Sequence, residues 1–271
     1  MKVLFCGDVV GRSGREAVLK HVPKLRQDLG LDFVVVNGEN AAAGFGITAK
    51  ICAELHAGGV DCITTGNHVW DQREIIPYIA QDKRLLRPVN FPPGTPGWGA
   101  NLFETPKGQK IVVINVMCRL FMDPLDDPFR TVEAEVAKYT LGRNAHFILV
   151  DVHGEATSEK QSMGHFFDGR VSAVLGTHSH IPTADSWVLP GGTAYQTDAG
   201  ACADYDSVIG MEKTEPLLRF TRKLGQGRMN PAQGPATVCG VFVETNDASG
   251  FAARIEPVRF GGRLKQAIPD V

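Results

Sequence analysis

Short apolar runs alternate with amphipathic stretches through the first third of the chain. Residues 2–7, 32–36 and 61–65 have the composition of buried strands, whereas residues 14–29 and 48–57 have the spacing of helices. Strands that alternate with helices in this way usually form a parallel sheet. The first 65 residues therefore predict a βαβαβ unit.

From residue 98 onward, strand pairs replace this alternation. The expected elements are a hairpin of residues 100–104 and 110–116, a helix near 130–140, strands at 146–151 and 171–176, and strand pairs near 185–197 and 236–260. Two groups of strands with helices outside predict an α/β fold, a four-layer αββα sandwich, with residues 1–271 forming a single domain. The Pro- and Gly-rich stretches 90–99 and 225–235 indicate surface connections or a lid.

Composition excludes several classes of protein. With 43% hydrophobic and 21% charged residues, the chain is neither disordered nor membrane-embedded, and no apolar run approaches the ~18 residues of a membrane span. The net charge of −2 argues against a protein that coats duplex nucleic acid. The N-terminus lacks the pattern of a secretory signal, which predicts a cytoplasmic protein. Six cysteines without a Cys-x-x-Cys pair are expected to be reduced and mostly buried: Cys6, Cys52, Cys62, Cys118, Cys202 and Cys239.

Side chains that can bind metals follow the predicted strands at their C-terminal ends. They are Asp8 after residues 3–7, Glu39 and Asn40 after 34–37, Asn67 and His68 after 62–65, His153 after 147–151, and His178 and His180 after 171–176. Open α/β sheets bind ligands at this edge, so these side chains are expected to converge there. The mixture of carboxylate, amide and imidazole groups without a thiolate favours manganese or iron over a structural zinc.

Each of these segments also has a plain structural interpretation. Asp8 could be a loop or cap carboxylate, the Glu39-Asn40 pair could serve a turn, and Asn67 could cap a helix. His178-Ser179-His180 is the stronger signal, because alternating histidines on an extended segment point the same way and can reach adjacent metals. Dinucleotide-binding, phosphate-loop and nucleophile-elbow motifs are absent from the sequence.

The order of these segments resembles the calcineurin-like metallophosphoesterase superfamily, and within it the YmdB-like phosphodiesterases. The resemblance covers most of the chain, as far as residue 211. It rests on four blocks: Asn37-Gly38-Glu39-Asn40-Ala41-Ala42-Ala43-Gly44, Thr65-Gly66-Asn67-His68-Val69-Trp70-Asp71, Gly154-Glu155-Ala156-Thr157-Ser158-Glu159-Lys160 and Tyr205-Asp206-Ser207-Val208-Ile209-Gly210-Met211.

The resemblance implies two metal ions bridged by Glu39. One ion would be held by Asp8, Glu39, Asn40 and His180, and the other by Glu39, Asn67, His153 and His178. The chain departs from the wider superfamily in two ways: Asp8-Val9-Val10 replaces the usual Asp-x-His opening, and Glu39 replaces the bridging aspartate. The resemblance implies that Asn40 takes the place of the missing histidine, although an asparagine there could instead bind a ligand or close an Asx-turn.

The implied reaction is hydrolysis of a small phosphodiester, including 2′,3′-cyclic nucleotides. Two metals lower the pKa of bound water from 15.7 to nearer ~7 and so provide a hydroxide nucleophile. His68 is implied as the proton donor to the leaving group, oriented by Asp71 or by a backbone carbonyl. Alternatives are a phosphomonoesterase or nucleotidase using the same metals, and a regulatory protein that binds RNA or a ribonuclease. A homo-oligomer is left open.

Overall fold

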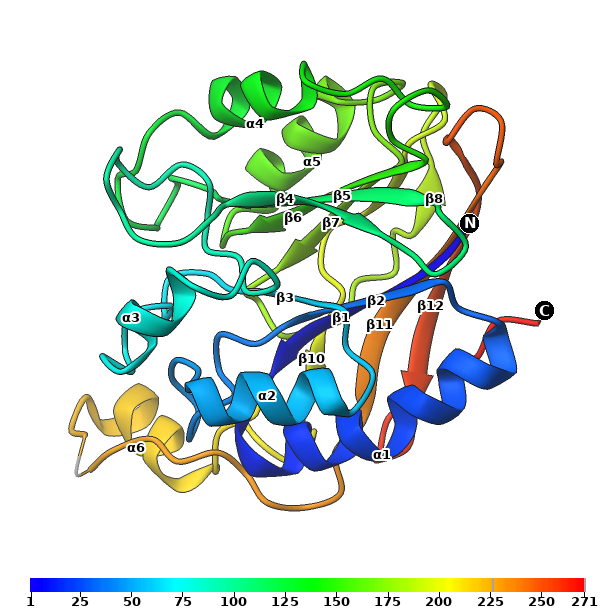
Figure 1. Ribbon diagram of the computed structural model, residues 1–271. Coiled ribbons are helices and arrows are strands. Elements are labelled where there is room, and N and C mark those ends of the chain that lie inside the picture. The colour runs from blue at the N-terminus through cyan, green and yellow to red at the C-terminus, as the bar shows by residue number, and fades with distance from the viewer. Residues whose placement is uncertain (226, 271) are drawn as a thin grey trace.

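The computed structural model, which describes residues 1–225 and 227–270, contains two six-stranded sheets (Figure 1). The first sheet has the strand order β12-β11-β1-β2-β3, with β10 paired to β1. Its strands are β1 (Lys2–Val9), β2 (Phe33–Asn37), β3 (Cys62–Thr64), β10 (Ala201–Cys202), β11 (Val238–Thr245) and β12 (Ala252–Phe260). The second sheet has the order β4-β5-β6-β7-β9-β8. Its strands are β4 (Ala100–Glu104), β5 (Lys110–Met117), β6 (Phe147–His153), β7 (Ala173–Thr177), β8 (Trp187–Val188) and β9 (Ala194–Gln196).

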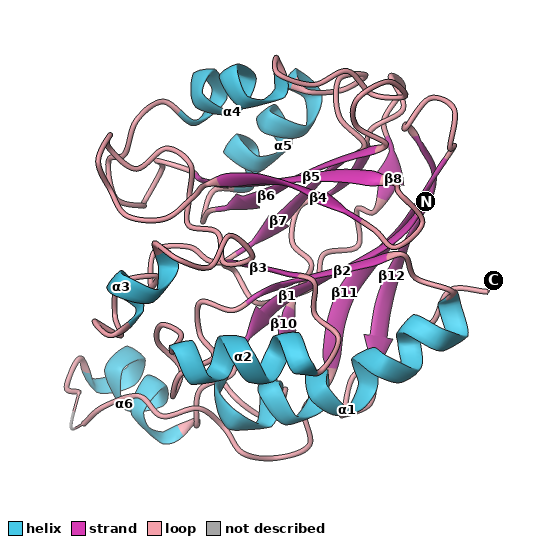
Figure 2. Cartoon of the chain, in the orientation of Figure 1, coloured by secondary structure: helices cyan, strands magenta, loops and turns pink. Residues whose placement is uncertain are grey.

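Helices cover the outer face of each sheet (Figure 2). The described helices are α1 (Gly11–Leu29), α2 (Ala49–Ala57), α3 (Ile75–Ile79), α4 (Pro128–Val136), α5 (Thr157–Phe166) and α6 (Thr214–Arg222). The alternation of side chains along β1 shows how the layers are joined. Leu4 packs with Val18 of α1 on one face, whereas Phe5 packs with Phe147 of the second sheet on the other. The α/β sandwich with αββα layers is therefore confirmed.

Parallel strands bring the ends of several chain segments to one edge. In the first sheet β1, β2 and β3 are parallel, and in the second β5, β6, β7 and β9 are parallel. The antiparallel pairs β4–β5, β8–β9 and β11–β12 confirm the predicted strand pairs. The C-terminal ends of the parallel strands and the loops that leave them carry the candidate ligands.

Four elements were not predicted from the sequence: α3, α5, α6 and β10. The α5 helix contains Ser158, Glu159 and Gln161 within two turns and buries Lys160, so it lacks the apolar stripe by which a surface helix is recognised. All six cysteines are buried and free, as predicted. Among the helices of the described residues, none combines the length and apolarity needed to cross a membrane.

Candidate metal centre

The candidate metal centre lies where the C-terminal ends of parallel strands from both sheets meet. The first sheet contributes Asp8 in β1, Glu39 and Asn40 after β2, and Asn67 after β3; the second contributes His153 in β6, and His178 and His180 after β7. Oxygen-bearing candidates thus come from one sheet and imidazoles from the other. Asp8 and His153 were predicted to follow their strands, but both are the last or nearly the last paired residues within them. Asp8 pairs with Asn37 of β2, and His153 pairs with Met117 of β5.

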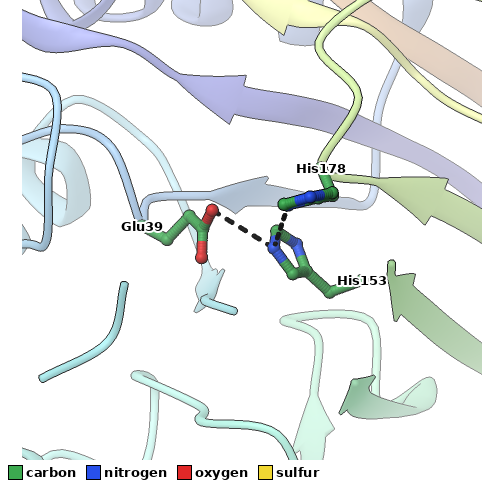
Figure 3. A group of neighbouring side chains, drawn as sticks. All are labelled: Glu39, His153 and His178. Atoms are coloured by element: carbon green, nitrogen blue, oxygen red, sulfur yellow. Dashed lines mark hydrogen bonds and ion pairs between the residues drawn. The ribbon is translucent and has the colours of Figure 1, made fainter. Parts of the chain in front are cut away.

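Glu39, His153 and His178 converge on one point (Figure 3). Nε2 of His153 lies 3.2 Å from Oε1 of Glu39, 3.1 Å from Nδ1 of His178 and 2.9 Å from Oδ1 of Asn67. The candidate ligand atoms of Glu39, His153 and His178 lie within 4.8 Å of one another. Since metals bind nitrogen and oxygen at roughly 2.0–2.2 Å, this spacing is close to that of ligands sharing one ion.

Asp8 and His180 form a second group beside the first. Nε2 of His180 lies 3.9 Å from Oδ1 of Asp8, and the backbone N–H of His178 donates to Oδ2 of Asp8 at 3.1 Å. Asn40 and Glu39 line the same cavity as His178 and His180. The structure therefore brings all seven predicted ligands to one region.

Three buried oxygens at this site accept no well-formed hydrogen bond: Oδ1 of Asp8, Oδ1 of Asn40 and Oε1 of Glu39, whose nearest polar neighbour is Nε2 of His153. In each side chain the other polar atom is anchored. Oδ2 of Asp8 accepts from His178, Oε2 of Glu39 accepts from the backbone N–H of His68 at 3.1 Å, and Nδ2 of Asn40 donates to the carbonyl of Gly44 at 3.1 Å. Buried oxygens without a well-formed hydrogen bond are costly unless a cation binds them, so these side chains fit a metal site.

The three histidines are held so that each directs one nitrogen at the site. Thr177 donates its hydroxyl proton to Asp151 at 2.8 Å and so accepts from Nδ1–H of His153 at 2.9 Å. The carbonyl of Ile209 accepts from Nδ1–H of His180 at 2.7 Å. These contacts leave Nε2 of both rings as the atom that could bind a metal.

The third imidazole, that of His178, is held so that Nδ1 instead of Nε2 is free. Oε2 of Glu155 lies 3.2 Å from Nε2 of His178, which favours a proton on Nε2 and leaves Nδ1 free. Nδ1 of His178 is the nitrogen that faces His153. A metal site therefore needs no rotation of any of the three rings.

The side chains at the centre shift one another's pKa values. Burial raises the pKa of Asp8. Burial would also raise that of Glu39, but the adjacent His153 and His68 outweigh it and lower this pKa to about 2. Burial opposes a charge on His153, yet Glu39 raises its pKa to about 9, whereas burial and then His153 lower the pKa of His178 to about 3. Glu39 therefore stays ionised beside His153, despite its burial.

The His178-Ser179-His180 segment is not extended, so the geometric reason given for it in the sequence analysis is wrong. The φ angles of His178 and His180 are 97° and 65°, in the left-handed region. A buried ion pair between Lys160 and Asp198 supports this turn. Nζ of Lys160 lies 2.9 Å from Oδ2 of Asp198, which also accepts from the backbone N–H of Ser179 at 3.0 Å. Ser179 is thereby fixed between the two histidines.

His68 and Asn67 follow a glycine that the geometry requires. A Cβ at Gly66 would lie 2.3 Å from both Oε2 of Glu39 and Nε2 of His153. Nδ1 of His68 lies 2.8 Å from Oδ2 of Asp71, so Asp71 is the orienting partner that the sequence left open. No helix begins at Asn67 among the described residues, which removes the helix-cap interpretation.

Sequence reasoning gave no role to two carboxylates beside the centre, Asp151 and Glu155. Asp151 is buried in the otherwise apolar β6 and accepts from Thr177, Asn37 and Asn115; burial raises its pKa to about 7. A carboxylate in the middle of a buried strand was a signal available in the sequence. The position of Glu155 beside His178 depends on how the chain folds and had no such signal.

Removing the carboxylate of Glu155 should weaken the metal centre. We expect Glu155→Ala to lower metal affinity or activity about 10- to 100-fold, the usual cost of losing a residue that orients a ligand. The fold should be unchanged because the Glu155 side chain is 53% exposed. Titration with Mn²⁺ against Glu104→Ala, an exposed position on β4, measures the effect. Equal affinities in the two variants would contradict the orienting role.

The sandwich and the two-sheet site define the class of the protein: a metallophosphoesterase-type α/β fold. The sequence matches the family model described as "YmdB-like protein" over residues 4–258. The chain belongs to this family, which confirms the resemblance.

Similar proteins agree with this membership. The chain is 44% identical over 258 residues to a Bacillus subtilis (strain 168) protein named 2′,3′-cyclic-nucleotide 2′-phosphodiesterase, covering 95% of this chain and 96% of that one. A crystal structure of a hypothetical protein from Thermus thermophilus matches with a TM-score of 0.90 and 41% identity, covering 97% of this chain and 100% of the other. A phosphatase structure from Mycoplasma pneumoniae matches with a TM-score of 0.87 and 32% identity, covering 96% and 93%.

Proposed function

We propose that this protein is a metal-dependent phosphodiesterase that hydrolyses 2′,3′-cyclic nucleotides. The observation that carries the proposal is the convergence of three buried oxygens that accept no well-formed hydrogen bond with three oriented imidazoles beside His68. The name of the Bacillus subtilis relative supports the same substrate class, since the similarity covers nearly the whole of both chains.

Two metal ions would occupy the site, with Glu39 shared between them. Asp8, Asn40 and His180 complete one ligand set, and Asn67, His153 and His178 complete the other. Iron or manganese suits this mixture of oxygen and imidazole ligands without thiolate. When bound, the ions supply positive charge for the phosphoryl oxygens and activate water as the nucleophile.

His68 supplies the proton that the leaving group needs. Water adds to the phosphorus of the cyclic diester and loses a proton to the solvent, and one ribose P–O bond breaks. The released alkoxide oxygen takes a proton from His68, which regains one from the solvent before the next turnover. Asp71 lies 2.8 Å from Nδ1 and so holds the ring with Nε2 directed away from it. His68 lines the cavity together with Glu39, Asn40, His178 and His180.

The function can be tested with protein purified without chelator. We expect about two iron or manganese ions per chain, and hydrolysis of a 2′,3′-cyclic nucleotide that is lost after chelation and restored by Mn²⁺. Elemental analysis and a panel of phosphate monoesters and diesters measure both properties. A metal-loaded protein that hydrolyses only monoesters would replace this proposal with the nucleotidase alternative, and a protein that binds no metal would overturn it.

A further inference from the structure

The cavity at the candidate metal centre has two unlike walls. Its volume is about 310 Å³, at the lower end of the ~300–1,000 Å³ range of small-molecule sites. One wall consists of the polar residues already described. The other, called the apolar wall here, consists of Phe45, Ile209, Met211 and Met229. The proposed reaction on a phosphodiester gives no role to the apolar wall.

Phe45 is fixed beside the proton donor. It follows β2 in a tight loop, in which Nδ2 of Asn40 donates to the carbonyl of Gly44 at 3.1 Å. Nε2 of Gln72 donates to the carbonyl of Phe45 itself at 2.8 Å. The Phe45 ring lies edge-on to the ring of His68, with centroids 5.1 Å apart. These hydrogen bonds therefore place an aromatic ring next to His68.

Ile209 lines the cavity at a conformational cost. It lies in a turn closed by hydrogen bonds between Val208 and Met211, with a φ of 49°, which is unfavourable for a β-branched residue. Two-residue turns of this kind usually have Asn or Gly at such a position. The carbonyl of Ile209 accepts a hydrogen bond from His180, while the residue as a whole is 50% exposed. The same strained residue thus serves both walls.

We infer that the apolar wall binds the nucleobase of the substrate. This inference rests on the proposed function and extends it. A cyclic nucleotide has an anionic phosphate at one end and a flat, largely apolar ring at the other, which matches the two walls. Arg228 lies over the Phe45 ring with its guanidinium carbon 6.0 Å from the centroid, so a base would use the ring face that Arg228 leaves open. The methionines adapt to bases of different size. None of the four side chains of the apolar wall offers a hydrogen-bond donor, so purines and pyrimidines are both accepted.

The test compares substrates that differ only in whether they carry a base. We expect Phe45→Ala to lower kcat/KM for adenosine 2′,3′-cyclic phosphate and cytidine 2′,3′-cyclic phosphate by about 10- to 100-fold, the effect of losing one stacking contact to a base. Glycerol 1,2-cyclic phosphate has the same five-membered cyclic diester and no base. Its hydrolysis should change less than about threefold. Metal content should equal that of the parent protein.

Met229→Ala provides a second variant on the apolar wall and should show the same selective loss. This substitution leaves the ring contact between Phe45 and His68 in place. Trp187→Ala, on β8 and outside the cavity lining, is the control and should affect none of the substrates. Equal losses on all three esters in both apolar-wall variants, or no loss in either, would overturn the base-binding role. If the parent protein hydrolyses none of the three esters, the proposed function itself fails, and that result is distinguishable from the others.

Discussion

Replacing Glu39 with glutamine should remove at least one metal and lower phosphodiesterase activity by about 10³-fold or more, equivalent to ~4 kcal/mol. Glu39 is buried and has the lowered pKa of a carboxylate that remains charged. Glutamine keeps the size of the side chain but removes the negative charge that would offset the two proposed cations. Removing one member of a buried ion pair lowers the free energy of unfolding by roughly 3–5 kcal/mol. Elemental analysis and initial rates on a 2′,3′-cyclic nucleotide measure the two effects.

Two control substitutions separate the effect of position from that of chemistry. Glu104→Gln makes the same change at an exposed position on β4, and His165→Gln removes an imidazole that lies outside the seven candidate ligands. Both variants should keep the metal content and activity of the parent protein. Equal metal loss in Glu39→Gln and either control would show that the site has been misplaced.

Replacing His68 with alanine should leave the metal content unchanged and lower activity on a cyclic nucleotide by about 10²- to 10⁴-fold, the range of general acid catalysis. The ribose alkoxide is a poor leaving group and needs a proton as the P–O bond breaks. A nitrophenyl phosphodiester has a leaving group that departs without one, so its hydrolysis should fall much less. The quantity to measure is the ratio of the two losses.

The metal content of His68→Ala decides how this ratio is interpreted. His68 is anchored through its backbone N–H to Oε2 of Glu39 and through its ring to Asp71. Only the second contact is lost in the variant, so Glu39 should remain in place. A ratio near one with metals retained would identify His68 as a positioning residue. Loss of metal would identify it as a ligand.

The position of the site could be predicted because parallel strands share an edge. Asp8, Glu39, Asn67 and His153 are separated widely in sequence, yet each belongs to the C-terminal end of a predicted parallel strand. This topology, more than any single motif, brings them together. The layered fold followed from the same alternation of strands and helices.

The conformation of the last two ligands could not be predicted in this way. Alternation along a strand predicts extended histidines, whereas His178 and His180 have positive φ angles. The cause lies in residues distant in sequence: Asp198 accepts the N–H of Ser179, and Asp8 accepts the N–H of His178. Local sequence propensity does not reveal such contacts. The α5 helix, which supplies Lys160, was missed because it lacks an apolar stripe.

The division of the ligands between the sheets links metal binding to the stability of the whole sandwich. The candidate oxygen ligands belong to the first sheet and the candidate imidazoles to the second, so any ion that binds both resists separation of the two layers. Such an ion binds the folded chain and not the unfolded one, and at 100 times its dissociation constant it adds ~2.7 kcal/mol to the free energy of unfolding. Without the ions, cohesion between the sheets depends on the apolar layer where Phe5 meets Phe147. A substitution that lowers the metal affinity of this site should therefore also lower the stability of the packing between the two sheets.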